Sequence, residues 1–546
     1  MAAPKHASPR ESLESLEGAP LLSPSILDAP RLPDSSPKKK KPWVLLVVLI
    51  FILVAIVDVG AFLAEAPKTR VYEANICVRY YRDLDPSKIL PDGTVDEEYC
   101  KEDKIQEKLA SIFGWQDLFD SIPAILLAVP FGTLADKHGR KWVFAASLLG
   151  LQLNSAWILF ICWFRSLPLQ LTWLSSAFYL IGGGPIVAAA IGLTMLSDIV
   201  PAEKRTTVFL YVTASVMVAE MIAPILARIL MERGDWYPLV LALAIQQVGV
   251  SIAALFPETL HLRDLPEPRD HERRNSVELH PPKTKIRQLF GFKAQVRHFK
   301  DALDFLRRDW QLALVIFTFF ASRIGRQALS LIIRYASKRY HWKIADANLL
   351  LSFRAATNLV AITVFVPVVN IMLIKIARLQ PHFADVWLAR GSIMLTAFAF
   401  FLMGVAAHPA ILIIGLLVFN LGTGYAAAMR SISIHIVGGQ SSPDIGRLFA
   451  VIAIIESMGT MVAGPTLSGL FQWGIDHGEP LIGAPFFFAM FIFVAVTFIT
   501  LMISAKDKEV IEYEEAAQED EDDVGLEGLG APIASGSALR RRSVEV

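Results

Sequence analysis

Charged residues are scarce in this chain of 546 residues: only 19% are Asp, Glu, Lys or Arg, whereas 54% are hydrophobic. A soluble protein of this length usually has about a quarter of its residues charged. The formal net charge is zero, so bulk charge indicates no nucleic-acid partner. Only three cysteines are present, and no cysteine–histidine cluster has the spacing of a zinc or other metal site. The sequence also lacks a nucleotide P-loop, a Gly-x-Ser-x-Gly segment and a His-Glu-x-x-His segment, which argues against an ATP-driven pump and against an enzyme.

Runs of about 20 apolar residues recur along the chain, and each is long enough to cross about 30 Å of hydrocarbon as an α-helix. We therefore expect an all-α integral membrane protein with twelve transmembrane helices in two six-helix bundles, at 43–256 and 311–505. The residues outside the bundles are expected to be cytoplasmic, with disordered ends at 1–42 and 506–546 and a central loop at 257–310 that carries an amphipathic helix. The expected spans are 43–64, 112–134, 142–164, 172–197, 206–230, 236–256, 311–335, 346–375, 384–406, 410–431, 446–472 and 484–505.

Basic residues predict the orientation of the chain. Four lysines at 38–41 precede the first apolar run, and the short loops 135–141 and 198–205 are also basic. The positive-inside rule then places both termini in the cytoplasm. The plasma membrane is the expected location, and a vacuolar membrane is the alternative.

Two of the three cysteines flank a polar stretch between the first two spans. The expected loop, 65–111, lies on the side opposite the termini, in a compartment that favours oxidation. We expect Cys77 and Cys100 to form a disulfide there, with two unpaired thiols as the alternative. The third cysteine, Cys162, lies in an apolar run and is expected to pack as a small hydrophobe.

The turn between the second and third spans reads Gly132-Thr-Leu-Ala-Asp136-Lys-His-Gly139-Arg140-Lys141. Gly139 permits a positive φ in this sharp turn, and Gly132 is expected to let a neighbouring helix approach closely. Asp136 lies at a helix end, where it can pair with an arginine or cap the N-terminus of a neighbouring helix. Arg140 and Lys141 favour a cytoplasmic position for the turn.

This segment is similar to the G-x-L-a-D-r-x-G-r-k signature of the major facilitator superfamily, and the resemblance covers roughly 43–505. It implies a fungal-type transporter that works by alternating access. In this family Asp198 and Arg205 join Asp136 in a cytoplasmic cluster, and the implied conformational latch consists of Gly132, Asp136, Gly139, Arg140, Lys141, Asp198 and Arg205. Phe256-Pro257-Glu258-Thr259 also resembles a segment that commonly follows the sixth helix. The second half departs from the family pattern, because 370–382 lacks the glycine and aspartate of a repeated signature.

A finer resemblance concerns the first long loop, Ile76-Cys77-Val-Arg79-Tyr80-Tyr81 with Cys100-Lys101. It looks like loops in the branch that contains proton-coupled folate transporters. This branch would imply proton-coupled movement of an organic anion.

Ionisable residues inside apolar spans are functional candidates, because each is costly to bury in a membrane. Three carboxylates, Asp58, Glu220 and Glu456, are candidates for proton coupling, with a permanent structural ion pair as the alternative. Three arginines are candidates for binding an anionic or zwitterionic substrate. The candidate substrate-binding residues are Arg323, Arg326, Arg354, Asn358, Asn420 and Gln327.

We therefore expect a secondary active transporter of a small organic solute, driven by a proton gradient and needing no other cofactor. The lipid bilayer and the solute are the expected partners, and a monomer is the expected state. Uptake and export are both open at this point. The alternative is a transporter-like nutrient receptor, which would bind its ligand and signal without moving it.

Overall fold

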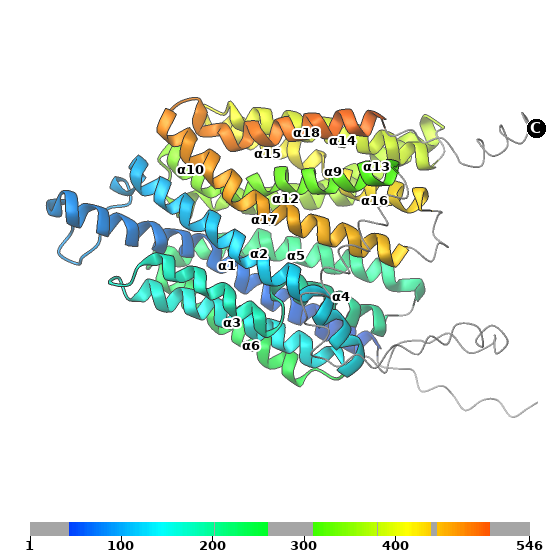
Figure 1. Cartoon of the computed structure of the whole chain (residues 1–546), viewed down its shortest axis with the longest axis horizontal. Helices are drawn as coiled ribbons and strands as arrows, with labels where there is room; N and C mark the ends of the chain where they lie inside the picture. Colours follow the sequence, from blue (N-terminus) through cyan, green and yellow to red (C-terminus); the bar gives the residue numbers. More distant parts are fainter. Residues whose placement is uncertain (1–42, 201, 260–309, 379–380, 438–444, 503–546) are drawn as a thin grey trace, which may run out of the picture. The chain divides into compact units, whose positions relative to one another are not determined.

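The computed structural model describes residues 43–200, 202–259, 310–378, 381–437 and 445–502. Within these ranges every regular element is a helix (Figure 1). Almost all of them belong to one compact unit, Leu46–Val546. The expected disordered ends and the amphipathic helix of the central loop lie outside the described residues.

The first bundle, here called the N-terminal half, has two short 3₁₀ helices, η2 (Pro86–Lys88) and η3 (Tyr99–Lys101), and seven longer helical elements. The longer elements are α1 (Trp43–Leu84), α2 (Asp103–His138), α3 (Arg140–Trp163), the 3₁₀ helix η4 (Leu169–Ile181), α4 (Gly184–Ile199), α5 (Ala202–Met231) and α6 (Trp236–Leu255).

The second bundle, the C-terminal half, is more interrupted. Its elements are α9 (Trp310–Gln327), η7 (Ala328–Leu331), α10 (Ile332–Tyr340), α11 (Ile344–Ala347), α12 (Leu349–Val360), α13 (Val366–Ile371), α14 (Pro381–Gly404), α15 (Pro409–Leu421), α16 (Tyr425–Ile436), α17 (Ile445–His477), η10 (Leu481–Gly483) and α18 (Ala484–Met502). Two short π-helical segments, Ala361–Phe365 and Met372–Ile376, flank α13.

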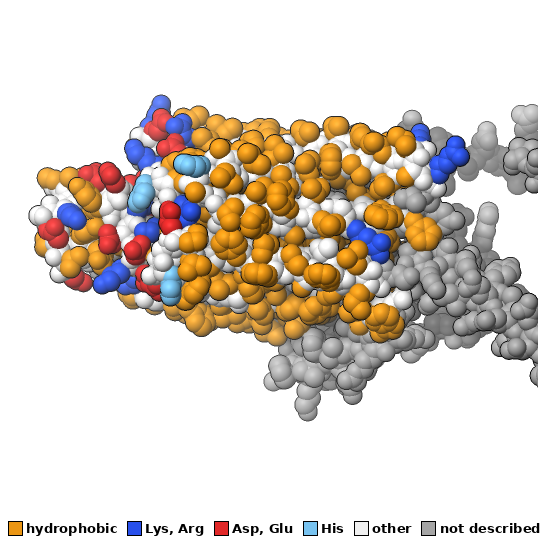
Figure 2. Space-filling view, turned by 90° about the horizontal axis from the view of Figure 1, so that it is seen from above, with side chains coloured by type: hydrophobic (Ala, Val, Ile, Leu, Met, Phe, Trp, Pro, Cys, Tyr) orange, Lys and Arg blue, Asp and Glu red, His pale blue; other side chains and the backbone are white. Residues whose placement is uncertain are grey.

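Eleven helical stretches among the described residues are long and apolar enough to cross a membrane. The number is twelve when α2, which bends by 46° between 128 and 130, is counted as one span. Large apolar side chains face outward over the middle of the bundle in Figure 2, where lipid replaces water as the solvent. Charged side chains gather toward one end of the same face. The expected all-α membrane fold is therefore confirmed.

The first long loop is shorter than expected. Helix α1 continues to Leu84 and α2 begins at Asp103, so the segment between them is 85–102, and the expected loop 65–111 includes parts of both helices. The helices extend because apolar residues such as Tyr72, Ile76 and Ile105 pack into a cluster of their own. The expected disulfide is present in this cluster and joins Cys77 to Cys100.

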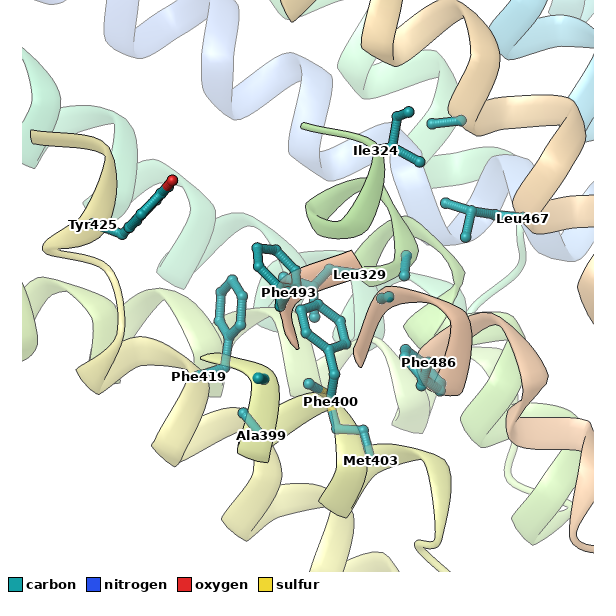
Figure 3. Close-up of a cluster of buried hydrophobic side chains, with 14 of the residues drawn as sticks. Ile324, Leu329, Ala399, Phe400, Met403, Phe419, Tyr425, Leu467, Phe486 and Phe493 are labelled. Atoms are coloured by element: carbon teal, nitrogen blue, oxygen red, sulfur yellow. The ribbon is translucent and has the colours of Figure 1, made fainter. Parts of the chain in front are cut away.

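The C-terminal half has a core of stacked aromatic rings (Figure 3). Phe400 of α14 and Phe493 of α18 stack with their centroids 5.2 Å apart and their planes 7° from parallel. Phe419 of α15 meets the same Phe400 ring edge-on at 5.6 Å. Such contacts fix the spacing of α14, α15 and α18 by more than area burial alone.

The two halves meet along two helix pairs, with α2 packed along α17 and α5 along α12. Small residues allow the first approach. A Cβ atom on Gly114 would lie 2.5 Å from the Cβ of Ser468, and a Cβ on Gly464 would lie 2.6 Å from the Cβ of Asp117. Close packing of this kind is typical of membrane helices that cross at small residues.

Candidate transport site

The turn between α2 and α3 has the conformation that the sequence predicts. Gly139 has a φ of +106°, and a Cβ atom there would lie 2.4 Å from a carboxylate oxygen of Glu258. That carboxylate accepts hydrogen bonds from the backbone N–H groups of Arg140, at 2.9 Å, and Lys141, at 3.2 Å. Glu258 thus caps the first turn of α3, where backbone donors lack partners within the helix. We call this end of the bundle the signature end.

Arg140 is the centre of the ionic cluster at the signature end. It pairs with Asp198 at 2.5 Å and with Asp136 at 3.3 Å, and it donates to the carbonyl oxygen of Thr194 at 2.7 Å. Three of the expected latch residues are therefore brought together. The side chain of Arg205, a fourth, lies outside the described residues.

Gly132 does not have the expected role. A Cβ atom at this position would meet no atom within 4 Å, so Gly132 lies against open space and not against a neighbouring helix. The sequence pattern correctly located the turn but attributed helix contact to the wrong glycine. Close approaches between α2 and α17 occur instead at Gly114 and Gly464.

Glu97 links the two halves at the opposite end, which we call the disulfide end. Its carboxylate accepts a hydrogen bond from the backbone N–H of Ile344 at 2.7 Å. Lys101 Nζ lies 3.0 Å and Arg70 Nε 3.3 Å from the same carboxylate. Burial alone would raise the pKa of Glu97, but Lys101, Arg70 and the Ile344 N–H outweigh it and hold the pKa below its ordinary value. Glu97 is therefore ionised at neutral pH.

Further contacts between the halves surround Glu97. Lys338 of α10 donates to the carbonyl oxygen of Lys101 at 2.6 Å and pairs with Asp103. Two more contacts connect α5 with the start of the α11–α12 segment, namely Arg228 with Asp346 at 2.8 Å and Asn348 with the carbonyl oxygen of Pro224 at 3.1 Å. Together these contacts join the halves at the disulfide end.

The three candidate carboxylates have different surroundings. Glu220 of α5 forms an ion pair with Arg354 of α12, so this pair bridges the halves. Glu456 of α17 pairs with Arg430 of α16 at 3.3 Å, entirely within the C-terminal half. Asp58 of α1 has no hydrogen bond to its buried Oδ2 atom and no ion pair among the residues that the structure describes.

Each of the three candidate arginines already has a partner within the protein. Arg354 is neutralised by Glu220, and Arg323 donates to Thr460 Oγ1 at 2.9 Å. Arg326 turns back along its own helix and donates to Ser322 Oγ at 3.1 Å. An anion would have to compete with these existing contacts.

The candidate amide side chains differ in how many of their hydrogen-bonding groups already have partners within the protein. Asn420 is buried, and its amide donates to the carbonyl oxygen of Arg354 at 3.0 Å and to Thr357, so it ties α15 to α12. Its amide oxygen is buried and has no donor. Asn358 approaches Met217 Sδ at 3.7 Å across the halves, and its oxygen has no donor. Gln327 is the last residue of α9.

Sequence reasoning missed several charged residues near the centre of the bundle. Asp117 lies on α2 against Gly464, and Asp120, one turn further, accepts hydrogen bonds from Gln116 at 2.9 Å and Ser176 at 2.5 Å. Arg334 is buried with its guanidinium 4.4 Å from the centre of the Phe113 ring, a cation–π contact. The available signal was the spacing of three between the two aspartates within an apolar run, which puts them on one helix face.

These features define a class of protein: a membrane transporter with two helical bundles, ionic clusters at both ends and buried charges between the bundles. The chain belongs to the Major Facilitator Superfamily, whose family model matches residues 105–437. It is a multi-pass transporter of small solutes and not an enzyme.

Two fungal proteins are similar over most of their lengths. The MFS efflux pump atnC of Emericella nidulans is 30% identical over 491 residues, which cover 88% of this chain and 94% of that protein. The efflux pump ustT of Aspergillus flavus is 28% identical over 426 residues, which cover 78% of this chain and 81% of that protein.

Solved structures agree on the fold alone. The human organic anion transporter MFSD10 aligns with a TM-score of 0.52 at 18% identity, covering 84% of this chain and all of that one. A D-xylose–proton symporter aligns with a TM-score of 0.55 at 12% identity, covering 85% of this chain and 99% of that one.

Proposed function

We propose that this protein exports a small organic solute in exchange for protons, by alternating access between the two halves. The direction is supported by the similarity to two fungal proteins named as efflux pumps. No cofactor besides the proton gradient is needed in this proposal, and a monomer is sufficient because one chain supplies both halves.

The observation that carries the proton coupling is the ion pair between Glu220 and Arg354. It bridges α5 and α12, so movement of one half against the other separates the two charges. A buried carboxylate that has an arginine partner in one state and loses it in the other releases a proton in the first state and binds one in the second. Glu456 and Asp58 are the other candidates, although Glu456 has its partner Arg430 within one half.

Positive charge supports the orientation that belongs to this proposal. Lys137, Arg140 and Lys141 lie at the signature end, which is thus assigned to the cytoplasm. The disulfide end then faces the outside or a lumen, where Cys77 and Cys100 would be oxidised. Contacts between the halves at that end correspond to a state closed to the outside. The plasma membrane is the proposed location and a vacuolar membrane the alternative.

Purified protein in liposomes with an acidic lumen and a trapped pH dye tests the proposal. Pools of organic cations, neutral compounds and anions are added outside. Antiport makes the lumen more alkaline as solute enters, because protons leave, whereas symport makes it more acidic. We expect alkalinisation with at least one pool, at least tenfold slower with Glu220→Gln and unchanged with Asp385→Asn, a matched acid-to-amide change on α14.

Two results would contradict the proposal. Acidification would show symport. Binding of a compound by folded protein without movement of solute or protons would favour the nutrient-receptor alternative.

A further inference from the structure

The N-terminal half contains a cavity of about 660 Å³ between α1, α3, α4, α5 and α6. This volume lies in the range of sites that bind drug-sized molecules. Most of its lining is aliphatic or aromatic, with residues such as Val54, Phe144, Leu148 and Leu193. The cavity therefore suits a solute with a largely apolar body.

The charged side chains that line the cavity are mostly acidic. They are Asp58, Glu65, Glu220 and Lys68, three carboxylates and one ammonium group. Lys68 Nζ lies 3.8 Å from Glu65, and Glu220 has Arg354 as its partner. Asp58 is left as the lining carboxylate without a cation among the described residues. Its surroundings thus favour a positively charged ligand and disfavour an anion.

Neutral side chains on the same lining also present acceptors without donors. Gln152 donates through its amide nitrogen to the carbonyl oxygen of Leu243 at 3.1 Å, which fixes its Oε1 atom as the free one. This Oε1, the Oε1 of Gln246 and the Oδ2 of Asp58 are all buried without a hydrogen-bond donor. Buried acceptors without donors are rare in folded proteins and are often satisfied by water or a ligand. A ligand with several N–H groups would satisfy them.

The geometry points to this cavity as the binding site for an apolar solute that carries a protonated amine, with Asp58 as its counter-ion and Gln152 and Gln246 as hydrogen-bond acceptors. The inference rests on the proposed function, since it specifies the class of solute that is exported. It replaces the anionic substrate expected from the sequence, because Arg354 is already paired and Arg323 and Arg326 lie on α9, outside this cavity.

Three compounds with one aromatic body test the charge preference. 1-Naphthylmethylamine is cationic at pH 7, 1-naphthylmethanol is neutral and 1-naphthylacetate is anionic. Their binding to the purified full-length protein in detergent is measured by calorimetry, without any gradient. We expect the amine to bind at least tenfold more tightly than either of the other two. Asp58→Asn should reduce that preference to less than threefold, while Asp58→Glu should retain most of it.

Asp385→Asn is the matched control, because Asp385 lies on α14 in the other half and accepts a hydrogen bond from Ser431. It should leave the preference unchanged. Tighter binding of the acetate, or an unchanged preference for the amine in folded Asp58→Asn protein, would overturn the assignment. The liposome assay separates this result from the proposed function: amine binding without transport would refute export, and transport without amine preference would refute the cavity assignment.

Discussion

The hydrogen bond between Glu97 and the Ile344 N–H gives a quantitative prediction about closure of the disulfide end. Lys101 and Arg70 belong to the same half as Glu97, so their contacts with it persist when the halves separate. Separation breaks the 2.7 Å bond to Ile344. A hydrogen bond to a charged group contributes about 1.5–3 kcal/mol, and one between neutral groups about 0.5–1.5 kcal/mol.

Glu97→Gln keeps an acceptor but removes its charge, so the closed state should lose about 1 kcal/mol relative to the open state, or about fivefold in population. Glu97→Ala removes the bond entirely and should lose about 2 kcal/mol, or about 30-fold. Neither variant leaves Lys101 unpaired, because its Nζ also lies 2.8 Å from Glu73. The larger penalty for an isolated buried charge therefore does not apply.

Hydrogen exchange read by mass spectrometry on peptides that cover Ile344 follows opening in the Glu97→Gln protein, which keeps an acceptor for this amide. We expect exchange of the Ile344 amide to rise about fivefold with Glu97→Gln, and by at least about 30-fold with Glu97→Ala, where the amide lacks its acceptor in both states. Glu98→Gln is the matched control, because Glu98 is the exposed neighbour in the same loop. If Glu97→Gln and Glu98→Gln gave equal exchange at Ile344, the contact would not contribute to closure.

The lowered pKa of Glu97 predicts how closure depends on pH. Because Lys101 and Arg70 contact Glu97 in both states, only the Ile344 N–H favours the ionised carboxylate in the closed state over the open state; this contribution is present above the ordinary glutamate pKa of 4.5 and is lost as pH falls below it through the lowered value. Exchange at Ile344, corrected for its intrinsic rate, should stay constant from pH 8 to about pH 5 and rise below the ordinary pKa. A rise centred near pH 6 would show that another group controls closure.

Two further sets of substitutions test local structure. The double substitution Cys77→Ser with Cys100→Ser removes a disulfide between residues 23 apart in sequence, for which loop-closure entropy gives up to about 3.4 kcal/mol of stability. Hydrogen exchange across 85–100 should therefore rise and the melting temperature should fall. An unchanged melting temperature would mean that packing alone holds the loop. Gly139→Ala should destabilise the protein by about 1–3 kcal/mol, because residue 139 has a positive φ and the added Cβ would meet Glu258. Gly132→Ala should be neutral or slightly stabilising, because a Cβ there meets no atom. Equal melting temperatures for the two variants would refute these different roles of the two glycines.

The sequence was sufficient for the membrane fold because burial in lipid imposes a simple requirement. A helix of about 20 apolar residues satisfies all its backbone groups within the membrane, so apolar runs mark the spans. The same rule fails where a helix leaves the membrane. Helix α1 continues to Leu84 through polar residues such as Glu73, which is buried against Lys101 and Gln106. A hydropathy pattern assigns such polar residues to a loop, because it does not show the partners that bury them, which lie elsewhere in the chain.

The charged residues of the candidate site could be selected from the sequence, but their partners could not. Charges inside apolar runs identified Glu220, Glu456 and Arg354, because any charge in that environment is unusual. Which residues pair depends on how helices cross. Arg430 stands near the expected end of its span, so its contact with Glu456 was not anticipated. Asp117 likewise lies near an end of an expected span, 112–134, where a charged residue is not unusual.

The contacts at the disulfide end are of the right strength to be reversible. Loop 85–102 is held within the N-terminal half by the disulfide and by the pairs of Lys101 with Glu73 and Glu97, so it does not have to form anew each time the halves meet. Separation breaks the Ile344 bond, the contacts of Lys338, the Arg228–Asp346 pair and the hydrogen bond from Asn348, a total of several kcal/mol. A solute bound with a dissociation constant of 1 μM provides about 8 kcal/mol of binding free energy. A ligand shifts a conformational equilibrium only by the difference between its binding free energies for the two states. A difference of about a third of those roughly 8 kcal/mol would suffice to shift the equilibrium between the closed and open states of the disulfide end.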